Sequence, residues 1–188
     1  MVLFHGTSGC AAENIMANGF NPTAVNWICS RKCHTYFVDA NYDGEGEWRG
    51  FEFAIDSALL CCAISGETDA RIGVIKLVIP DELAESAKDE YICPDSSCEN
   101  MTDCYEIDTE WLNTAIANGD VKVFVSYHDL YKRDLRVFYL APLVKEYVNI
   151  KDNELREVIN HLSSIDFYND DLYEYMRQYP NYEEVVWQ

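Results

Sequence analysis

The chain has 188 residues, of which 48% are apolar and 25% are charged, so it is long enough and apolar enough for a compact core. Thirty-three acidic residues face fourteen basic ones, which gives a formal net charge of −19. Such a surface repels nucleic acid and anionic membranes, and it favours a basic protein partner or serves solubility alone. The thirteen Tyr, eight Phe and four Trp argue against intrinsic disorder, because burying aromatic rings offsets chain entropy.

The first part of the chain predicts a strand, a turn, a helix and a second strand. Residues 2–5 are a short apolar strand, and the glycine-rich residues 6–9 are expected to turn the chain. A helix follows from about residue 10, with apolar residues at helical spacing, and Gly19 ends it. Residues 35–38 are β-branched and aromatic, which favours a strand.

The middle of the chain contains the clearest strand. Residues 43–46 predict a polar loop, and the apolar residues 51–64 predict a buried helix, although 51–55 could instead be a strand. Residues 73–79 are apolar apart from Lys76 and predict a strand that Pro80 ends.

Beyond Pro80 the pattern weakens before it returns. Residues 81–103 are polar and predict a long loop with one helical turn. Residues 105–107 predict a strand and 111–118 a short helix, followed by strands at 121–125 and 136–140.

The last part of the chain is acidic and rich in Tyr, and its apolar residues return to helical spacing over 155–162 and 172–176. We therefore expect a main domain over residues 1–150 and a helical C-terminal segment over 151–188 packed on it. The pattern as a whole predicts an α+β fold with mainly antiparallel strands.

The N-terminus shows no basic region followed by a long apolar stretch, and no window approaches the ~18 apolar residues that a membrane span needs. We expect a cytoplasmic protein, in its own cell or in a target cell, and therefore cysteines that are mostly thiols. Two groups of residues have spacings outside the tight pairs typical of zinc modules, so no metal is expected. These groups are Cys29, Cys33 and His34, and Cys93, Cys98 and Cys104.

Three short motifs could carry chemistry, and the first is His5-Gly6-Thr7 at the end of the first strand. A His supplies a directional hydrogen bond that suits a ribose hydroxyl, and a Gly lets a ligand amide approach the backbone closely. Taken alone, the motif is better explained as a strand end with a satisfied His, by roughly two to one.

The second motif centres on Tyr36 within residues 34–38, and the third on Glu106 within residues 104–107. A Tyr at a strand edge can stack on a flat ring such as nicotinamide. A carboxylate beside a ribose can hold its 2′-hydroxyl and stabilise an oxocarbenium-like transition state. A core Tyr and a solvated Glu are each commoner for any single residue, but together the motifs occur in the order His, Tyr, Glu, each on an expected strand.

With this order the chain resembles the His-Tyr-Glu class of ADP-ribosyltransferases, which includes poly(ADP-ribose) polymerases and the diphtheria and exotoxin A group. The resemblance spans about residues 2–125. The segments that carry it are Phe4–Thr7, Gly19–Phe20, Tyr36–Phe37, Trp48–Phe51, Asp56–Leu59, Gly73–Pro80, and Glu106 with Trp111.

The resemblance implies a split, mainly antiparallel β-sheet domain that uses NAD⁺ as a substrate. The implied reaction cleaves the nicotinamide–ribose bond and transfers one ADP-ribose to a protein acceptor, with no nucleic-acid or membrane partner. A toxin, an effector or a viral counter-defence factor would fit such an activity.

The resemblance also implies roles for individual residues. His5 would bond the adenosine-side or the nicotinamide-side ribose, Gly6 would bind the carboxamide through its backbone, and Thr7 would support the first turn. Tyr36 would stack on nicotinamide, and Glu106 would hold the nicotinamide ribose and stabilise positive charge as nicotinamide leaves. The implied catalytic residues are His5, Tyr36 and Glu106, and the implied NAD-binding residues are His5, Gly6, Thr7, Tyr36 and Phe37.

Two other functions stay open. An RNA 2′-phosphotransferase uses a related fold and a similar His-Gly-Thr start, but it needs several Arg near a phosphate, and Arg31 and Arg49 are the only early candidates. A non-catalytic acidic module on the same fold could mimic an acidic ligand of a basic partner. That interpretation gains weight if Glu52, rather than Tyr36, takes the aromatic position of the second motif.

Overall fold

The structure of the chain is a computed structural model that describes residues 1–23, 31–44, 46, 49–51, 53–55, 57–58, 61, 71–95, 103–129 and 183–185. In chain order its elements are β1 (Val2–Ser8), α1 (Gly9–Asn18), β2 (His34–Asp39), the 3₁₀ helix η1 (Tyr42–Gly44), β3 (Arg71–Val78), α3 (Asp81–Ala87), β4 (Ile92–Pro94), β5 (Cys104–Asp108), α4 (Thr109–Ala117), β6 (Lys122–Asp129) and β7 (Glu183–Val185). Residues 49–51, 53–55, 57–58 and 61 are also helical. The helix expected over 51–64 is therefore confirmed at its described residues and the alternative strand at 51–55 is wrong, while the helical residues 49 and 50 were not expected.

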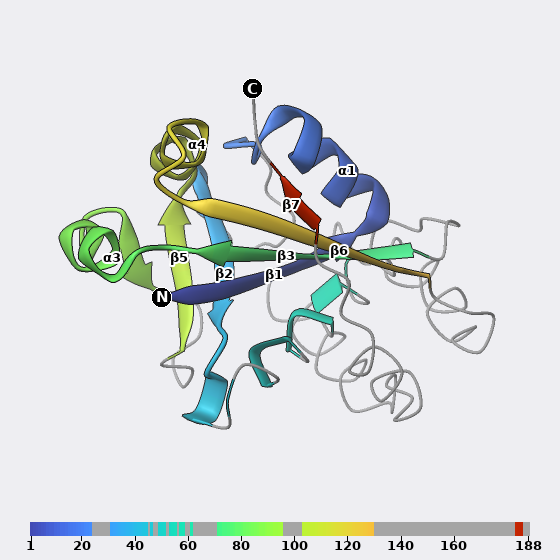
Figure 1. Ribbon diagram of the computed structural model, residues 1–188, viewed down its shortest axis with the longest axis horizontal. Coiled ribbons are helices and arrows are strands. Elements are labelled where there is room, and N and C mark those ends of the chain that lie inside the picture. The colour runs from blue at the N-terminus through green and yellow to red at the C-terminus, as the bar shows by residue number, and fades with distance from the viewer. Residues whose placement is uncertain are drawn as a thin grey trace, which may run out of the picture.

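Within the described residues, the strands form one sheet in the order β4-β5-β2-β1-β3-β6-β7, and every neighbouring pair is antiparallel. The expected α+β class is therefore confirmed. Strand β1 pairs with β3 along its whole length, but it pairs with β2 only at Leu3↔Asp39 and Phe4↔Val38. Figure 1 shows the consequence, because β1, β3 and β6 run across the view whereas β2 and β5 run steeply across them. Within this one sheet, β1 and β2 pair at only these two positions and separate after Phe4.

Apolar side chains cover both faces of the central strands. On one face, Leu3, Ile75 and Leu77 pack in a core with residues of α1 and α4. On the other face, the Phe4 ring meets Phe51 edge-on, with ring centroids 5.9 Å apart. Figure 1 shows α1 and α4 on one side of β1, β3 and β6, and the helical residues around Phe51 on the other. Burial on both faces explains why the strand at 73–79 lacks a polar alternation.

Helix α1 lies close to β3 because small residues meet there. A Cβ built on Gly73 would lie 2.3 Å from the Cβ of Ala12, so the close approach requires a glycine. The Ser8 side chain accepts a hydrogen bond from the first turn of α1, and the helix ends at Gly19, whose φ of 81° is left-handed. The Gly19 N–H bonds the carbonyl of Ile15 at 2.8 Å. The predicted helix and its glycine ending are both confirmed.

Two predicted loops are wrong. Residues 6–9 do not form a turn, because β1 continues through Ser8 and its last residues pair with β3. The stretch 81–103 contains α3 and the three-residue strand β4. Two acidic residues in the first turn of α3 suit its N-terminus, and the Met1 ammonium group donates to Asp81 at 2.7 Å. Strand β4 is too short to show a period, and its pairing with β5 is a tertiary contact.

The predicted C-terminal segment is described only at residues 183–185, which form β7 on the outer edge of β6. A strand at this place was not predicted. The helices expected over 155–162 and 172–176 and the strand expected at 136–140 lie outside the described residues. The described end of the chain therefore belongs to the same sheet as the N-terminal strands.

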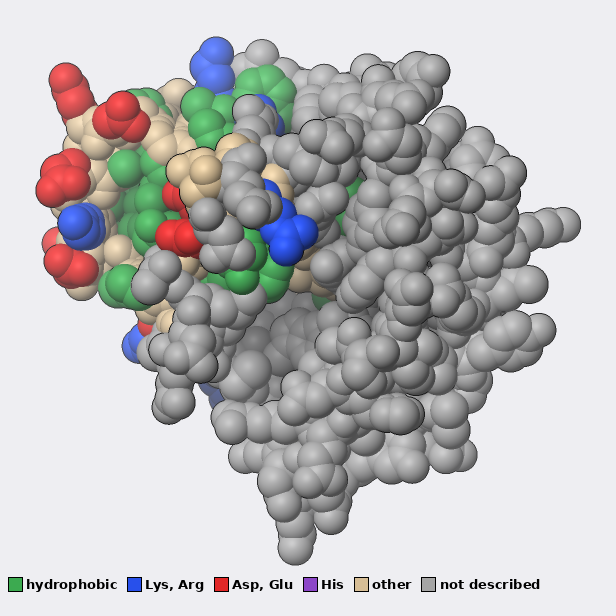
Figure 2. Space-filling view, turned by 90° about the horizontal axis from the view of Figure 1, so that it is seen from below, with side chains coloured by type: hydrophobic (Ala, Val, Ile, Leu, Met, Phe, Trp, Pro, Cys, Tyr) green, Lys and Arg blue, Asp and Glu red, His purple; other side chains and the backbone are tan. Residues whose placement is uncertain are grey.

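Acidic side chains gather at the end of the molecule where α3 lies, as Figure 2 shows. The exposed acidic residues there are Asp81, Glu82, Glu85, Asp89 and Glu90. In the described part of the chain, no helix is both long and apolar enough to span a membrane.

Candidate functional site

A pocket of about 300 Å³ lies where β1 and β2 separate, a size within the range of small-molecule sites. All five residues expected to bind NAD line it. Strand β1 contributes His5, Gly6 and Thr7, and strand β2 contributes Tyr36 and Phe37. The pocket thus collects residues from two motifs that the sequence separates.

The His5 side chain reaches from β1 to β2 at the point where these two strands separate. Its Nδ1 lies 2.8 Å from the carbonyl oxygen of Tyr36. A carbonyl only accepts, so Nδ1 carries the proton and Nε2 of the neutral ring is an acceptor. Burial lowers the pKa of His5 below its ordinary value, and the bond to the Tyr36 carbonyl opposes this only in part. A neutral His5 can therefore accept a hydrogen bond from a ligand hydroxyl.

The pairing pattern of β1 shows where the Gly6 backbone points. Met1 and Ile79 exchange both of their backbone hydrogen bonds, at 2.9 Å each. Bonded and non-bonded pairs alternate along an antiparallel ladder, so His5 bonds β3 while Gly6 directs its N–H and C=O toward β2. The bond from Ala40 N–H to the Val2 carbonyl fits the same alternation. Gly6 therefore presents its backbone groups to the pocket.

Gly6 has a packing role as well. A Cβ at this position would lie 1.6 Å from the carbonyl oxygen of Ala54, so only glycine fits beneath the helical residues on that face. Thr7 is buried within β1 and pairs with Gly73, so the expectation that it supports a turn is wrong. Phe37 packs behind the imidazole of His5, with ring centroids 5.5 Å apart. The motif is thus part of the core as well as of the pocket wall.

Tyr36 and Glu106 lie directly opposite each other on β2 and β5. The Tyr36 hydroxyl donates to Oε2 of Glu106 at 3.5 Å, a long hydrogen bond. Glu106 is only 2% exposed, so it is not the solvated surface residue that an acidic chain would most often supply. The three residues that the sequence suggested as catalytic are therefore neighbours on β1, β2 and β5.

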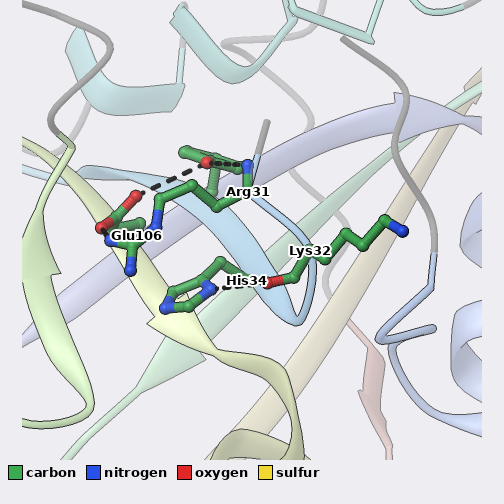
Figure 3. Close-up of polar contacts among 5 residues, drawn as sticks. Arg31, Lys32, His34 and Glu106 are labelled. Atoms are coloured by element: carbon green, nitrogen blue, oxygen red, sulfur yellow. Dashed lines mark hydrogen bonds and ion pairs between the residues drawn. The ribbon is translucent and has the colours of Figure 1, made fainter. Parts of the chain in front are cut away.

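Arg31 covers Glu106 from the solvent side. Its guanidinium forms an ion pair with Oε1 of Glu106, and its backbone N–H donates to the Tyr36 hydroxyl at 2.7 Å. Figure 3 shows the Arg31 side chain extended to Glu106. Glu106 does not itself line the pocket. The sequence indicated Arg31 only as a phosphate ligand, because an ion pair between residues 75 positions apart leaves no local signal.

The turn that carries Arg31 is anchored at Cys33. This residue has a left-handed φ of 65°, which is uncommon outside glycine. Its N–H bonds the Pro22 carbonyl at 2.9 Å, and its carbonyl accepts from Thr109 N–H at 2.8 Å. Nδ1 of His34 also bonds the Lys32 carbonyl at 2.9 Å, as Figure 3 shows. The turn is held by backbone contacts that do not involve the Arg31 side chain.

Asn113 on α4 is a further supporting residue that the sequence did not indicate. Its side-chain oxygen accepts from Phe20 N–H at 2.9 Å, and its Nδ2 donates to the Phe20 carbonyl at 2.8 Å. The Phe20 ring packs edge-on against His5, with centroids 5.9 Å apart. Asn113 thereby holds one wall of the pocket, through a contact across 93 residues.

The cysteines give no metal centre in the described part of the chain, where no three His, Cys, Asp or Glu side chains are placed to hold an ion. Cys33, Cys93 and Cys104 are thiols there. Cys29 and Cys98 lie outside the described residues. The expectation of no metal stays a prediction for the whole chain.

Comparison of the chain with protein-family models, with curated proteins and with solved structures finds no match. The resemblance to ADP-ribosyltransferases therefore stays a prediction. Some of the residues that carry it, and the alternative Glu52, lie outside the described residues. A function must then be assigned from the chemistry of the pocket and its neighbours.

Proposed function

We propose that the chain is an NAD⁺-dependent mono-ADP-ribosyltransferase whose catalytic residues are His5, Tyr36 and Glu106. The observation that carries the proposal is their juxtaposition beside one pocket. His5 bonds the Tyr36 carbonyl at 2.8 Å, and the Tyr36 hydroxyl reaches Glu106 at 3.5 Å. These residues come from three strands, and each has the chemistry that one part of a nicotinamide riboside requires.

The pocket offers groups for each part of that ligand. The half-buried Tyr36 ring supplies a flat surface for nicotinamide. The N–H and C=O of Gly6 match the acceptor and donor of the carboxamide, since they point into the separation between the strands. Nε2 of His5 accepts from a ribose hydroxyl. If β1 and β2 stayed paired, the Gly6 N–H and C=O would bond β2; because the two strands separate, these groups can bond a ligand.

In the proposed reaction the bond between the nicotinamide nitrogen and the ribose carbon breaks. The electron pair leaves with nicotinamide, whose ring becomes neutral, and positive charge develops on the ribose. The Glu106 carboxylate stabilises that charge and holds the 2′-hydroxyl. A nucleophile of the acceptor protein then bonds the ribose carbon and loses its proton to solvent.

The acceptor in this proposal is a protein with a basic surface. The chain carries a net charge of −19 and exposes acidic residues along α3, so a basic partner is attracted to it and nucleic acid is repelled. Such a transferase would act in a cytoplasm, as a toxin, an effector or a viral counter-defence factor.

The direct test is release of nicotinamide from NAD⁺ labelled in its ADP-ribose part, in the presence of a cell lysate. Wild-type protein should release nicotinamide and label a protein band. Glu106→Gln should lower the rate by about 10²–10³-fold, the typical loss when a group that stabilises a charged transition state is removed. Glu110→Gln is the matched control, because Glu110 is exposed on α4. Release that persists in Glu106→Gln would contradict the assigned role of this residue.

One observation favours a second function, a non-catalytic acidic binding module. Glu106 is already paired with Arg31, as a structural carboxylate would be. Such a module would release no nicotinamide and would bind basic proteins equally well after Glu106→Gln. The RNA 2′-phosphotransferase gains no support, since Arg31 is held by a carboxylate and Arg49 does not line the pocket.

A further inference from the structure

Glu106 is a buried carboxylate whose charge is paired with the guanidinium of Arg31. A buried charge is costly unless an opposite charge and hydrogen bonds compensate it. In the described part of the chain, the ion-pair partner of Glu106 is Arg31, and the long hydrogen bond from Tyr36 adds little. Without NAD⁺, Arg31 therefore supplies most of the compensation for this charge.

The position of Arg31 allows its side chain to move away from Glu106. Its side chain is 56% exposed, against 2% for Glu106, so one end of the ion pair faces solvent. The turn beneath it is fixed by the two backbone bonds of Cys33, which do not depend on the guanidinium. Rotation of the side chain can break the ion pair while the turn stays in place.

The proposed substrate brings a competing positive charge. The nicotinamide ring of NAD⁺ is a cation, and stacking on Tyr36 would place it beside Glu106, the cross-strand neighbour of Tyr36. Two cations at one buried carboxylate repel each other in a region of low dielectric. NADH has the same shape in outline, but its dihydronicotinamide ring is neutral and cannot replace a lost counter-cation.

We infer that Arg31 is a displaceable counter-cation of Glu106, which the positively charged nicotinamide ring replaces when NAD⁺ binds. This inference rests on the proposed function. It makes Arg31 a residue that restrains binding of the cationic coenzyme and leaves binding of the neutral one unaffected.

The test compares two ligands on matched variants. The first ligand is the carbocyclic analogue of NAD⁺, which keeps the cationic ring but forms no oxocarbenium ion and so is not consumed; the second is NADH. Arg31→Gln should bind the analogue about tenfold more tightly than wild type does, as expected if Glu106 is open in roughly a tenth of wild-type molecules. Its affinity for NADH should not change. Lys32→Gln is the matched control, because Lys32 lies on the same turn without an ion pair to Glu106.

Calorimetric titration of each variant, after a thermal melt that confirms folding, gives these affinities. The double variant Arg31→Gln/Glu106→Gln leaves no unpaired buried charge, and in it the preference for the cationic ligand should disappear. Unchanged or weaker binding of the analogue by Arg31→Gln would overturn the inference, as would equal tightening for both ligands. If no variant binds either ligand, the proposed function itself fails, whereas nicotinamide release without tighter binding in Arg31→Gln defeats this inference alone.

Discussion

Strand β1 has two neighbours, and it pairs with them very differently. It bonds β3 along its whole length, but it pairs with β2 only at Leu3 and Phe4. The complete ladder leaves no backbone group for a ligand, whereas the interrupted ladder directs the Gly6 amide and carbonyl into a pocket. An antiparallel sheet can therefore build a binding site simply by ending one ladder early.

The two sides of β1 differ in composition as well. Toward β3 and β6 the partners include fully buried apolar residues such as Ile75 and Leu77. Toward β2 and β5 they include Tyr36 and the buried, ion-paired Glu106. One side thus presents fully buried apolar residues, and the other holds the polar pair Tyr36 and Glu106 beside the pocket.

The largest expected loss of stability comes from a substitution in β3, the strand that pairs with β1 along its whole length. Leu77→Ala removes a completely buried side chain from β3 and should lower the free energy of unfolding by about 2–5 kcal/mol. Its ladder partner is Leu3, away from the pocket, so nicotinamide release per folded molecule should stay near the wild-type rate. Urea unfolding and a rate assay well below the midpoint check both expectations. A large loss of rate in folded protein would show that the two sides are not separable.

A smaller loss of stability is expected from a change at Gly6, which pairs with β3 and also lines the pocket beside β2. Gly6→Ala places a methyl group against the backbone carbonyl of Ala54, so the helical residues must move, at a cost of about 1–3 kcal/mol. Gly73→Ala is the matched control, since its clash is with the side chain of Ala12. Ala12→Gly should restore part of the stability lost in Gly73→Ala, but no side-chain change at position 54 should rescue Gly6→Ala. Wild-type stability of Gly6→Ala in thermal melts would show that the helical residues yield freely.

The smallest expected effect is the contribution of His5, which lies where β1 and β2 separate, to the pH dependence of stability. Because burial lowers its pKa in the folded protein, folded His5 stays neutral while unfolded His5, with a pKa of about 6.5, takes up a proton. Above that pH both states are neutral and the residue adds no pH dependence. As the pH falls below it, the unfolded state is favoured, and stability declines until the pH reaches the folded pKa.

His5→Asn should remove this decline. Unfolding in urea at a series of pH values from about 8 to 5, with wild type and variant compared at each pH, isolates the His5 contribution, since the carboxylates are common to both proteins. A constant difference between the two proteins across the series would mean that His5 is not protected from protonation.

The parts of the fold that the sequence predicted are those with a local signal. The strand at 73–79 is apolar except for Lys76 because both of its faces are largely buried, and α1 shows helical spacing with a glycine at its end. The order His5, Tyr36, Glu106 was also visible, because each residue lies within a segment of strand character. Strand β4 was missed because a three-residue strand has no period. Helix α3 was predicted only as one helical turn within a loop, because a polar helix resembles a loop.

By itself, then, the sequence determined where most of the longer strands and helices α1 and α4 lie, and which three side chains have chemistry worth bringing together. Only the tertiary structure decided that Tyr36 lies opposite Glu106, that β1 and β2 separate after Phe4, and that Arg31 pairs with Glu106. Strand formation depends on neighbouring residues along the chain, and so it leaves a pattern there. Register, the end of a ladder and a buried ion pair depend on residues far apart in the chain, whose energies are set only once the sheet has assembled.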